Sequence, residues 1–166
     1  MTQQTTRRNF LYSALAGSAC VSVLGWASSG SRAFAEGNFE ITKTDAEWRE
    51  ILPEPVFQVL RKEDTERPFS SPLNDEKRAG LFHCAGCDLP LYSSEHKFDS
   101  GTGWPSFYQS LENAVGTKED KSFFTTRTEV HCRRCGSHLG HIFDDGPAPT
   151  GKRHCLNGVS LVFKAA

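Results

Sequence analysis

The chain has 166 residues, of which 37% are hydrophobic, with 19 basic and 20 acidic residues and a formal net charge of −1. This length allows one domain with a substantial core. The balanced charge lacks the clustered positive excess of nucleic-acid-binding proteins, so no nucleic-acid partner is expected.

The first 35 residues have the pattern of an export signal. Arg7-Arg8 gives a basic start, residues 11–26 form an apolar run of mostly small residues, and residues 33–35 read as a small-x-small cleavage site. The adjacent arginines are similar to those of twin-arginine signals. The alternatives are a membrane anchor, a buried helix, or a lipoprotein cysteine at Cys20. The run is short and rich in Gly and Ser, which disfavours a membrane span.

We therefore expect residues 1–35 to be removed, leaving residues 36–166 as one domain, exported to the bacterial periplasm without a stable membrane anchor. That domain would retain 16 basic and 20 acidic residues, a formal charge of −4. Twin-arginine export carries folded proteins, so a metal can be loaded in the reducing cytoplasm. A monomer is the default expectation.

Two short helices are expected after an extended arm at residues 36–41. Residues 44–52 begin with a capping-box pattern, in which Thr44 and Glu47 can each bond the other's backbone N–H. Residues 53–61 place proline in the first turn and apolar residues at helical spacing. Both helices are interpreted as packing elements without chemistry.

From Gly80 onward the pattern changes to short strands separated by turn-forming residues, as in antiparallel β structure. The sequence therefore predicts a mainly β domain with short N-terminal helices. The expected strands cover residues 80–83, 89–92, 122–130, 140–143 and 159–164.

Four cysteines form two Cys-x-x-Cys pairs, Cys84/Cys87 and Cys132/Cys135. Four thiolates at this spacing can form a closed tetrahedral site, which predicts one structural Zn²⁺ per chain. Two disulfides, or a redox dithiol of the thioredoxin type, are the alternatives. Neither pair is followed by the helical pattern typical of such a dithiol.

Cys155 is left over once the two pairs and Cys20 are set aside. Arg153 and His154 precede it, and neighbouring cations lower the pKa of a thiol; a buried structural cysteine is the alternative. Two further stretches stand out: residues 98–107, a Gly-rich turn that presents an aromatic, and residues 136–147, with two histidines and two carboxylates. Alone, each could be a packed turn or a solvated hairpin.

Together these motifs resemble the B-type peptide methionine sulfoxide reductases, which act on the R epimer of the sulfoxide. The resemblance implies a β-tent-like fold of two antiparallel sheets, with structural zinc far from the active site. It also implies that the substrates are oxidised proteins bearing methionine-R-sulfoxide, and that the function is repair of exported proteins. The match runs from about residue 43 to residue 163 and rests on residues 65–69, the two Cys-x-x-Cys pairs, and residues 103–107, 138–147 and 153–157.

The resemblance also assigns roles. Cys155 would be the nucleophile that attacks the sulfoxide sulfur and becomes a sulfenic acid. His141 would protonate the departing oxygen, with Asp145 orienting or polarising it. The assisting residues would be His138 and Asn157 as hydrogen-bond partners of the oxygen or water, Arg153 favouring the thiolate, and Trp104 and Phe107 binding the substrate, with Trp104 against its methyl group. The alternatives are core packing for Trp104 and a structural hydrogen bond for His138.

Two positions depart from the family pattern. Thr102 stands where many relatives carry a second, resolving cysteine. We therefore expect an external thiol, from a thioredoxin-like protein or another reductant, to reduce Cys155 through a mixed disulfide. His154 stands where relatives often have an aromatic, and it either tunes the Cys155 pKa or fills that space.

A zinc-ribbon interaction module is the alternative from another class of protein. It would explain the two Cys-x-x-Cys pairs and the short strands. It would not explain Cys155 beside Arg153, nor the two histidines of residues 136–147.

Overall fold

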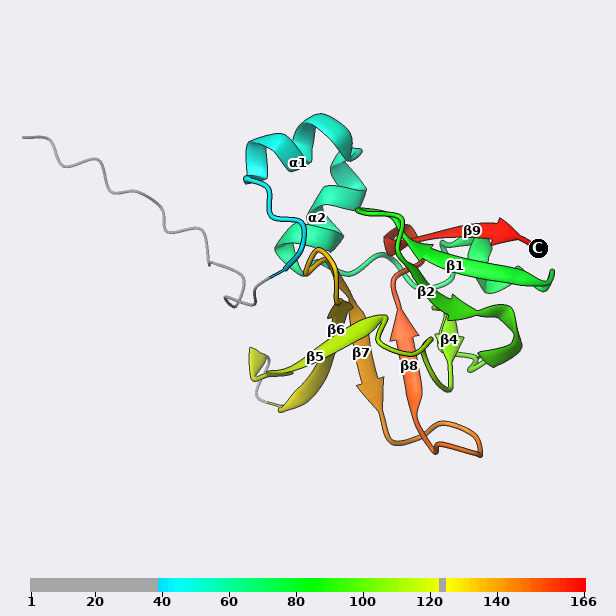
Figure 1. The fold of residues 1–166 in the computed structure, drawn as a ribbon. Helices are drawn as coiled ribbons and strands as arrows, with labels where there is room; N and C mark the ends of the chain where they lie inside the picture. The colour runs from blue at the N-terminus through cyan, green and yellow to red at the C-terminus, as the bar shows by residue number, and fades with distance from the viewer. Residues whose placement is uncertain (1–38, 123–124) are drawn as a thin grey trace, which may run out of the picture. The chain divides into compact units, whose positions relative to one another are not determined.

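The computed structural model describes residues 39–122 and 125–166 (Figure 1). The predicted export signal, residues 1–35, lies outside the described residues. Neither helix of the described part has the length and apolar character needed to cross a membrane.

Both predicted helices are present, as α1 (Asp45–Ile51) and α2 (Glu54–Lys62). The capping box of α1 is formed: the Thr44 hydroxyl accepts the Glu47 N–H, and the Glu47 carboxylate accepts the Thr44 N–H at 2.7 Å. These bonds satisfy backbone donors that the first helical turn leaves free. Helix α2 lies against β7 and the turn that follows β8, so it closes one end of the domain (Figure 1).

The described strands form two antiparallel sheets, which confirms the predicted fold class. The small sheet has the order β2-β1-β9, and the large sheet has the order β3-β4-β8-β7-β6-β5. The strands are β1 (Gly80–Cys84), β2 (Pro90–Ser93), β3 (Lys97–Phe98), β4 (Ser106–Phe107), β5 (Val115–Asp120), β6 (Arg127–Cys132), β7 (His138–Phe143), β8 (Arg153–Leu156) and β9 (Leu161–Ala165). Short 3₁₀ turns are η1 (Pro72–Asn74), η2 (Ser94–His96) and η4 (Gly158–Ser160).

Three predicted strands begin later than expected, among them β2, which begins at Pro90, one residue after the predicted start. The strand predicted at residues 122–130 begins at Arg127, and residues 123–124 of that prediction lie outside the described residues. The strand predicted at residues 159–164 begins at Leu161, because η4 occupies the preceding three residues. Strands β3, β4, β5 and β8 were not predicted; the residues of β5 are mostly polar and partly exposed, so they lack the apolar alternation that marks a strand.

Aromatic side chains join the two sheets. Phe82 of β1 and Tyr92 of β2 pack on Phe107 of β4, with ring centroids 4.9 and 4.6 Å from that of Phe107. Phe107 is fully buried in this core. Phe107, which was predicted to bind substrate, therefore packs in the core between the two sheets, and its role toward substrate stays a prediction.

Candidate active site and metal centre

Strand register places three functional side chains in a row. Cys155 on β8 is paired with Ser106 on β4 and with His141 on β7. Directly opposed residues in antiparallel strands project from the same face of the sheet. Ser106 and His141 therefore flank Cys155, while His154, its neighbour in sequence, points to the opposite face.

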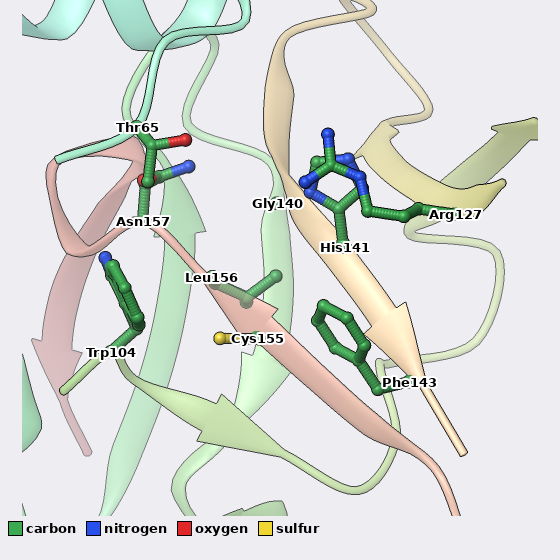
Figure 2. Close-up of a pocket in the computed structure, with 9 residues that line it drawn as sticks. All are labelled: Thr65, Trp104, Arg127, Gly140, His141, Phe143, Cys155, Leu156 and Asn157. Carbon is green, nitrogen blue, oxygen red and sulfur yellow. The ribbon is translucent and has the colours of Figure 1, made fainter. Parts of the chain in front are cut away.

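A cavity of about 140 Å³ opens at Cys155. Figure 2 shows Trp104 on one side of the Cys155 sulfur, and His141 and Phe143 on the other. The cavity brings together four residues predicted for the site, Cys155, His141, Asn157 and Trp104. Its complete lining is Thr65, Trp104, Arg127, Gly140, His141, Phe143, Cys155, Leu156 and Asn157.

His141 takes a different carboxylate partner from the one expected. Its Nε2 lies 2.8 Å from Oδ2 of Asp120, which also pairs with Arg127 at 2.7 Å. Burial lowers the pKa of His141, and the hydrogen bond with Asp120 acts in the opposite direction. Asp145, which was predicted to orient or polarise His141, accepts two hydrogen bonds from Arg153, at 2.8 and 2.9 Å.

Cys155 is a half-buried thiol. Burial raises its pKa, whereas the Thr102 hydroxyl and the Arg153 charge act to lower it. The predicted influence of Arg153 is therefore present but smaller than the effect of burial. The Arg153 guanidinium also lies over the Phe143 ring, 4.5 Å from its centroid, so Arg153 fixes one wall of the cavity as well.

His138 and Asn157 were expected to bond the sulfoxide oxygen or water, and the structure ties both to protein groups. His138 is 1% exposed and does not line the cavity; its Nδ1 lies 2.8 Å from the buried Glu129 carboxylate. The Asn157 amide accepts the Glu66 N–H at 3.0 Å and donates to the Leu139 carbonyl at 3.1 Å. Both side chains hold the walls of the site in position.

A β-bulge between β6 and β7 explains why both histidines of the His138–His141 stretch lie on one face. The register shifts between Val130 and His131, and the two histidine rings are 5.4 Å apart at their centroids. A Cβ at Gly140 would lie 2.0 Å from the Cys155 carbonyl oxygen. Only glycine therefore allows β7 to approach β8 this closely.

His154 fills core space and does not contact the cavity. Its side chain is buried, and its Nδ1 lies 3.0 Å from the Tyr92 hydroxyl. Burial lowers the pKa of His154 to about 4. The neutral imidazole therefore fills core space at a position where relatives often have an aromatic ring.

The four cysteines of the two pairs lie together, with their sulfur atoms all within 4.8 Å of one another. The distances are 3.7 Å for Cys84–Cys135 and 3.5 Å for Cys87–Cys132. Ligands about 2.3 Å from a tetrahedral zinc lie about 3.8 Å apart, so this donor set can hold a metal ion. All four are free thiols, which does not fit the disulfide alternative.

Sequence reasoning missed several residues of the site. Phe143 lay within the histidine stretch, but nothing marked it as a wall. Asp120 and Arg127 come from the end of β5, where three charged residues follow one another, and the start of β6, which is also polar, so both stretches read as a solvated surface. Only the pairing of those strands with β7 brings them to His141.

Comparisons with known proteins agree with this geometry. A family model described as "SelR domain" matches residues 52–165. The peptide methionine sulfoxide reductase MsrB of Methanosarcina barkeri is 54% identical over 125 residues, covering 75% of this chain and 88% of that protein. The MsrB of Pseudomonas putida (strain W619) is 54% identical over 126 residues, covering 75% and 95%.

More distant relatives include a chloroplastic peptide methionine sulfoxide reductase B1 of Oryza sativa, 49% identical over 128 residues, covering 76% of this chain and 60% of that protein. The solved structure of the Mis18 "Yippee-like" domain aligns with a TM-score of 0.44 and 16% identity, over 54% of this chain and 98% of that one, which is too distant to bear on function. The match to the family model and the identity to these relatives show that the chain belongs to the SelR-domain family. This family comprises the B-type peptide methionine sulfoxide reductases, which are oxidoreductases.

Proposed function

We propose that this chain reduces the R epimer of methionine sulfoxide in proteins to methionine, with Cys155 as the nucleophile. The observation that carries the proposal is the placement of the Cys155 sulfur in a cavity between Trp104 and His141 (Figure 2). A thioether with one polar oxygen needs an apolar wall and a proton donor, and the cavity offers both.

The reaction balances with two thiol equivalents. The Cys155 thiolate attacks the sulfoxide sulfur, the S–O bond breaks, and the oxygen passes to Cys155 as a sulfenic acid while methionine is released. A reductant thiol then attacks Cys155, releasing water and leaving a mixed disulfide. A second reductant thiol resolves that disulfide and restores the Cys155 thiol.

His141 supplies the proton that the sulfoxide oxygen needs as the S–O bond breaks. The imidazole faces the cavity; burial lowers its pKa, and the bond to Asp120 opposes this by favouring the protonated form. Trp104 is held by a bond of 3.1 Å from its indole N–H to the Glu66 carbonyl, so its ring is a fixed surface against which the substrate methyl packs. A wall of fixed shape rejects the other epimer sterically.

An external thiol is proposed as the reductant, because the other cysteines of the described residues are gathered in the four-cysteine site. Cys132 lies two strands from β8 and three residues beyond Glu129, the residue opposite His141. Its Cα is therefore on the order of 14 Å from that of Cys155, given strand spacings of about 4.8 Å and a rise of about 3.3 Å per residue. Cysteines joined by a disulfide have Cα atoms less than about 7 Å apart.

The metal of the four-cysteine site is proposed to be one structural Zn²⁺. Four sulfur ligands leave no open position, so the ion would stabilise the fold and take no part in the reaction. Export to the periplasm and repair of oxidised exported proteins are proposed from residues 1–35. Periplasmic fractionation of cells carrying the full chain, beside a variant with Arg7→Lys and Arg8→Lys, tests the export: an unchanged distribution would contradict the twin-arginine route.

The reaction is tested with the metal-loaded full chain, a peptide containing methionine sulfoxide, and dithiothreitol as the reductant. Wild type should form methionine over many turnovers, and Cys155→Ser should form none while it keeps its metal and its circular dichroism spectrum. A Cys155→Ser variant that still reduces the peptide would exclude Cys155 as the nucleophile. A wild type without turnover would favour a zinc-ribbon interaction module.

External reduction is tested by omitting the reductant. One turnover should leave a single oxygen atom on Cys155, which dimedone traps and peptide mass spectrometry locates. A disulfide between Cys155 and another cysteine of the chain would instead show that an internal thiol resolves the sulfenic acid.

A further inference from the structure

Three hydroxyl groups form a series of hydrogen bonds that ends at the Cys155 sulfur. Thr102 Oγ1 lies 3.9 Å from Cys155 Sγ, within reach of a hydrogen bond to sulfur. Ser100 Oγ lies 2.8 Å from Thr102 Oγ1 and 2.8 Å from Ser106 Oγ. Ser106 in turn donates to the Trp104 carbonyl at 3.2 Å. The series of hydrogen bonds therefore runs from a backbone acceptor, the Trp104 carbonyl, to the reacting atom, the Cys155 sulfur.

The direction of these bonds follows from counting protons, because each hydroxyl has one to donate. When Ser106 donates to the Trp104 carbonyl, Ser100 donates to Ser106 and Thr102 donates to Ser100. The Thr102 oxygen then accepts from the Cys155 thiol. A Cys155 thiolate has no proton to donate, so the Thr102 hydroxyl must turn and donate to the sulfur, and Ser100 is free to donate to either neighbour.

The loop that carries Thr102 is held on both sides. Asp99 accepts the Gly101 N–H at 2.9 Å, and the Gly103 carbonyl accepts the Phe69 N–H at 2.7 Å. Gly101 and Gly103 have φ of +69° and +92°, and a Cβ at Gly103 would lie 2.8 Å from the Phe69 nitrogen. Such a loop fixes the position of the hydroxyl before substrate binds, which is the condition for a group that acts on charge as it develops.

We propose that Thr102 is a catalytic residue of this site, whose hydroxyl accepts from the Cys155 thiol and donates to the Cys155 thiolate, with Ser100 as the partner that allows the reversal. The inference deepens the proposed function, on which it rests. Arg153 and Ser106 are the other donors near the sulfur, but the Arg153 guanidinium is bonded to Asp145 at 2.8 and 2.9 Å, and Ser106 donates its proton to the Trp104 carbonyl. Thr102 is then the neutral donor that offsets the burial of the thiolate.

The test measures the rate of Cys155 alkylation by iodoacetamide as a function of pH, with the metal-loaded full chain and no methionine sulfoxide. Alkylation of Cys155 is read from its own peptide by mass spectrometry, since other cysteines also react. Other charged or titratable groups near Cys155 are Arg127 on β6, His141 on β7 and Arg153 on β8, and they stay unchanged in every variant.

Thr102→Val keeps the shape of the side chain and removes the hydroxyl, so the pH midpoint of alkylation should rise by about one unit. At neutral pH, a rise of one unit makes the alkylation of Cys155 about tenfold slower, which is equivalent to ~1.4 kcal/mol. Thr102→Ser keeps the hydroxyl and should restore the wild-type midpoint. Thr102→Ala also removes the hydroxyl, but it places no methyl group against the sulfur. Its pH midpoint of alkylation should rise by the same amount, and it serves as the hydroxyl-free variant if Thr102→Val folds poorly.

An unchanged midpoint in both hydroxyl-free variants would overturn the proposal, and so would a Thr102→Ser midpoint equal to that of Thr102→Val. The measurement needs no turnover of sulfoxide. A chain that fails to reduce methionine sulfoxide but shows these shifts would contradict the proposed function and leave the role of Thr102 toward the Cys155 sulfur intact.

Discussion

Strand alternation gives two adjacent residues opposite environments. Cys155 faces the cavity, and His154 faces the core, where it meets the Tyr92 hydroxyl. The same alternation places Ser106 beside the Cys155 sulfur and buries Phe107. A side chain's role at this site therefore depends on the face of the sheet from which it projects more than on its distance from Cys155 along the chain.

His154 should make the folded state sensitive to acid. Burial holds the pKa of His154 at about 4 in the folded chain, whereas an unfolded histidine has a pKa near 6.5. Between these pH values the unfolded chain binds a proton that the folded chain does not. Stability attributable to His154 is thus full above about pH 6.5 and is lost as the pH falls towards 4. His138, whose pKa burial also lowers to about 4, acts in the same direction.

The substitution His154→Phe should remove the His154 part of this sensitivity. Between pH 7 and pH 5 the variant should lose about 2 kcal/mol less unfolding free energy than wild type, measured by urea denaturation at both values. The lost bond to Tyr92 affects both pH values equally and cancels in the comparison. Equal losses in the two proteins would show that His154 is already protonated in the fold.

At the scale of elements, Glu66 ties the loop before η1 to the end of β8. Its carboxylate accepts the Gly158 N–H and, at 3.1 Å, the Val159 N–H. Its own N–H donates to Asn157, and its carbonyl accepts the Trp104 indole N–H at 3.1 Å. Two cavity-lining residues from separate segments are therefore held by one residue outside the cavity.

Glu66→Gln should destabilise the fold and weaken substrate binding together. An amide can offer one acceptor oxygen but presents N–H groups to the second backbone donor, which costs about 1–3 kcal/mol. Thermal unfolding should shift down by several degrees, and KM for the sulfoxide peptide should rise. The matched control is Glu119→Gln, which removes an exposed ion pair with Lys121. A Glu66→Gln variant as stable as this control would contradict the anchoring role.

Much of the element structure was readable from the sequence. The capping box at Thr44 and Glu47, the proline at the start of α2 and the two cysteine pairs are local signals, and the structure bears out each of them. The partner of His141 was not readable, because Asp145 is four residues away in sequence while Asp120 reaches His141 only through the order of β5, β6 and β7. Polar strands lack the alternation of apolar and polar residues, so the sequence does not indicate which distant strands pair with each other.

At the scale of the whole molecule, the four-cysteine site joins the two sheets. Cys84 ends β1 of the small sheet, and Cys132 ends β6 of the large sheet. An ion bound there cross-links segments that are far apart in sequence. Metal binding of this kind contributes directly to the free energy of folding.

Removal of the metal should therefore unfold the chain. Structural zinc sites bind with about 10–16 kcal/mol, comparable to the whole stability of a typical domain at about 5–15 kcal/mol. A strong chelator should release one equivalent of zinc, measured by a metal indicator, and abolish the cooperative thermal transition. Renewed zinc under reducing conditions should restore it. A metal-free chain with an unchanged transition would show that the four thiols need no ion.

The cavity at Cys155 is proposed to accept one epimer of methionine sulfoxide and to be the place where it is reduced. The most direct measurement is kcat/KM for peptides carrying the separated R and S sulfoxides, with the metal-loaded full chain and dithiothreitol. We expect turnover of the R epimer and none detectable for the S epimer, because the fixed Trp104 ring fits the methyl in only one arrangement of oxygen toward His141. Equal rates for both epimers would show that the walls of this cavity do not select the substrate, and reduction of the S epimer alone would contradict the assignment.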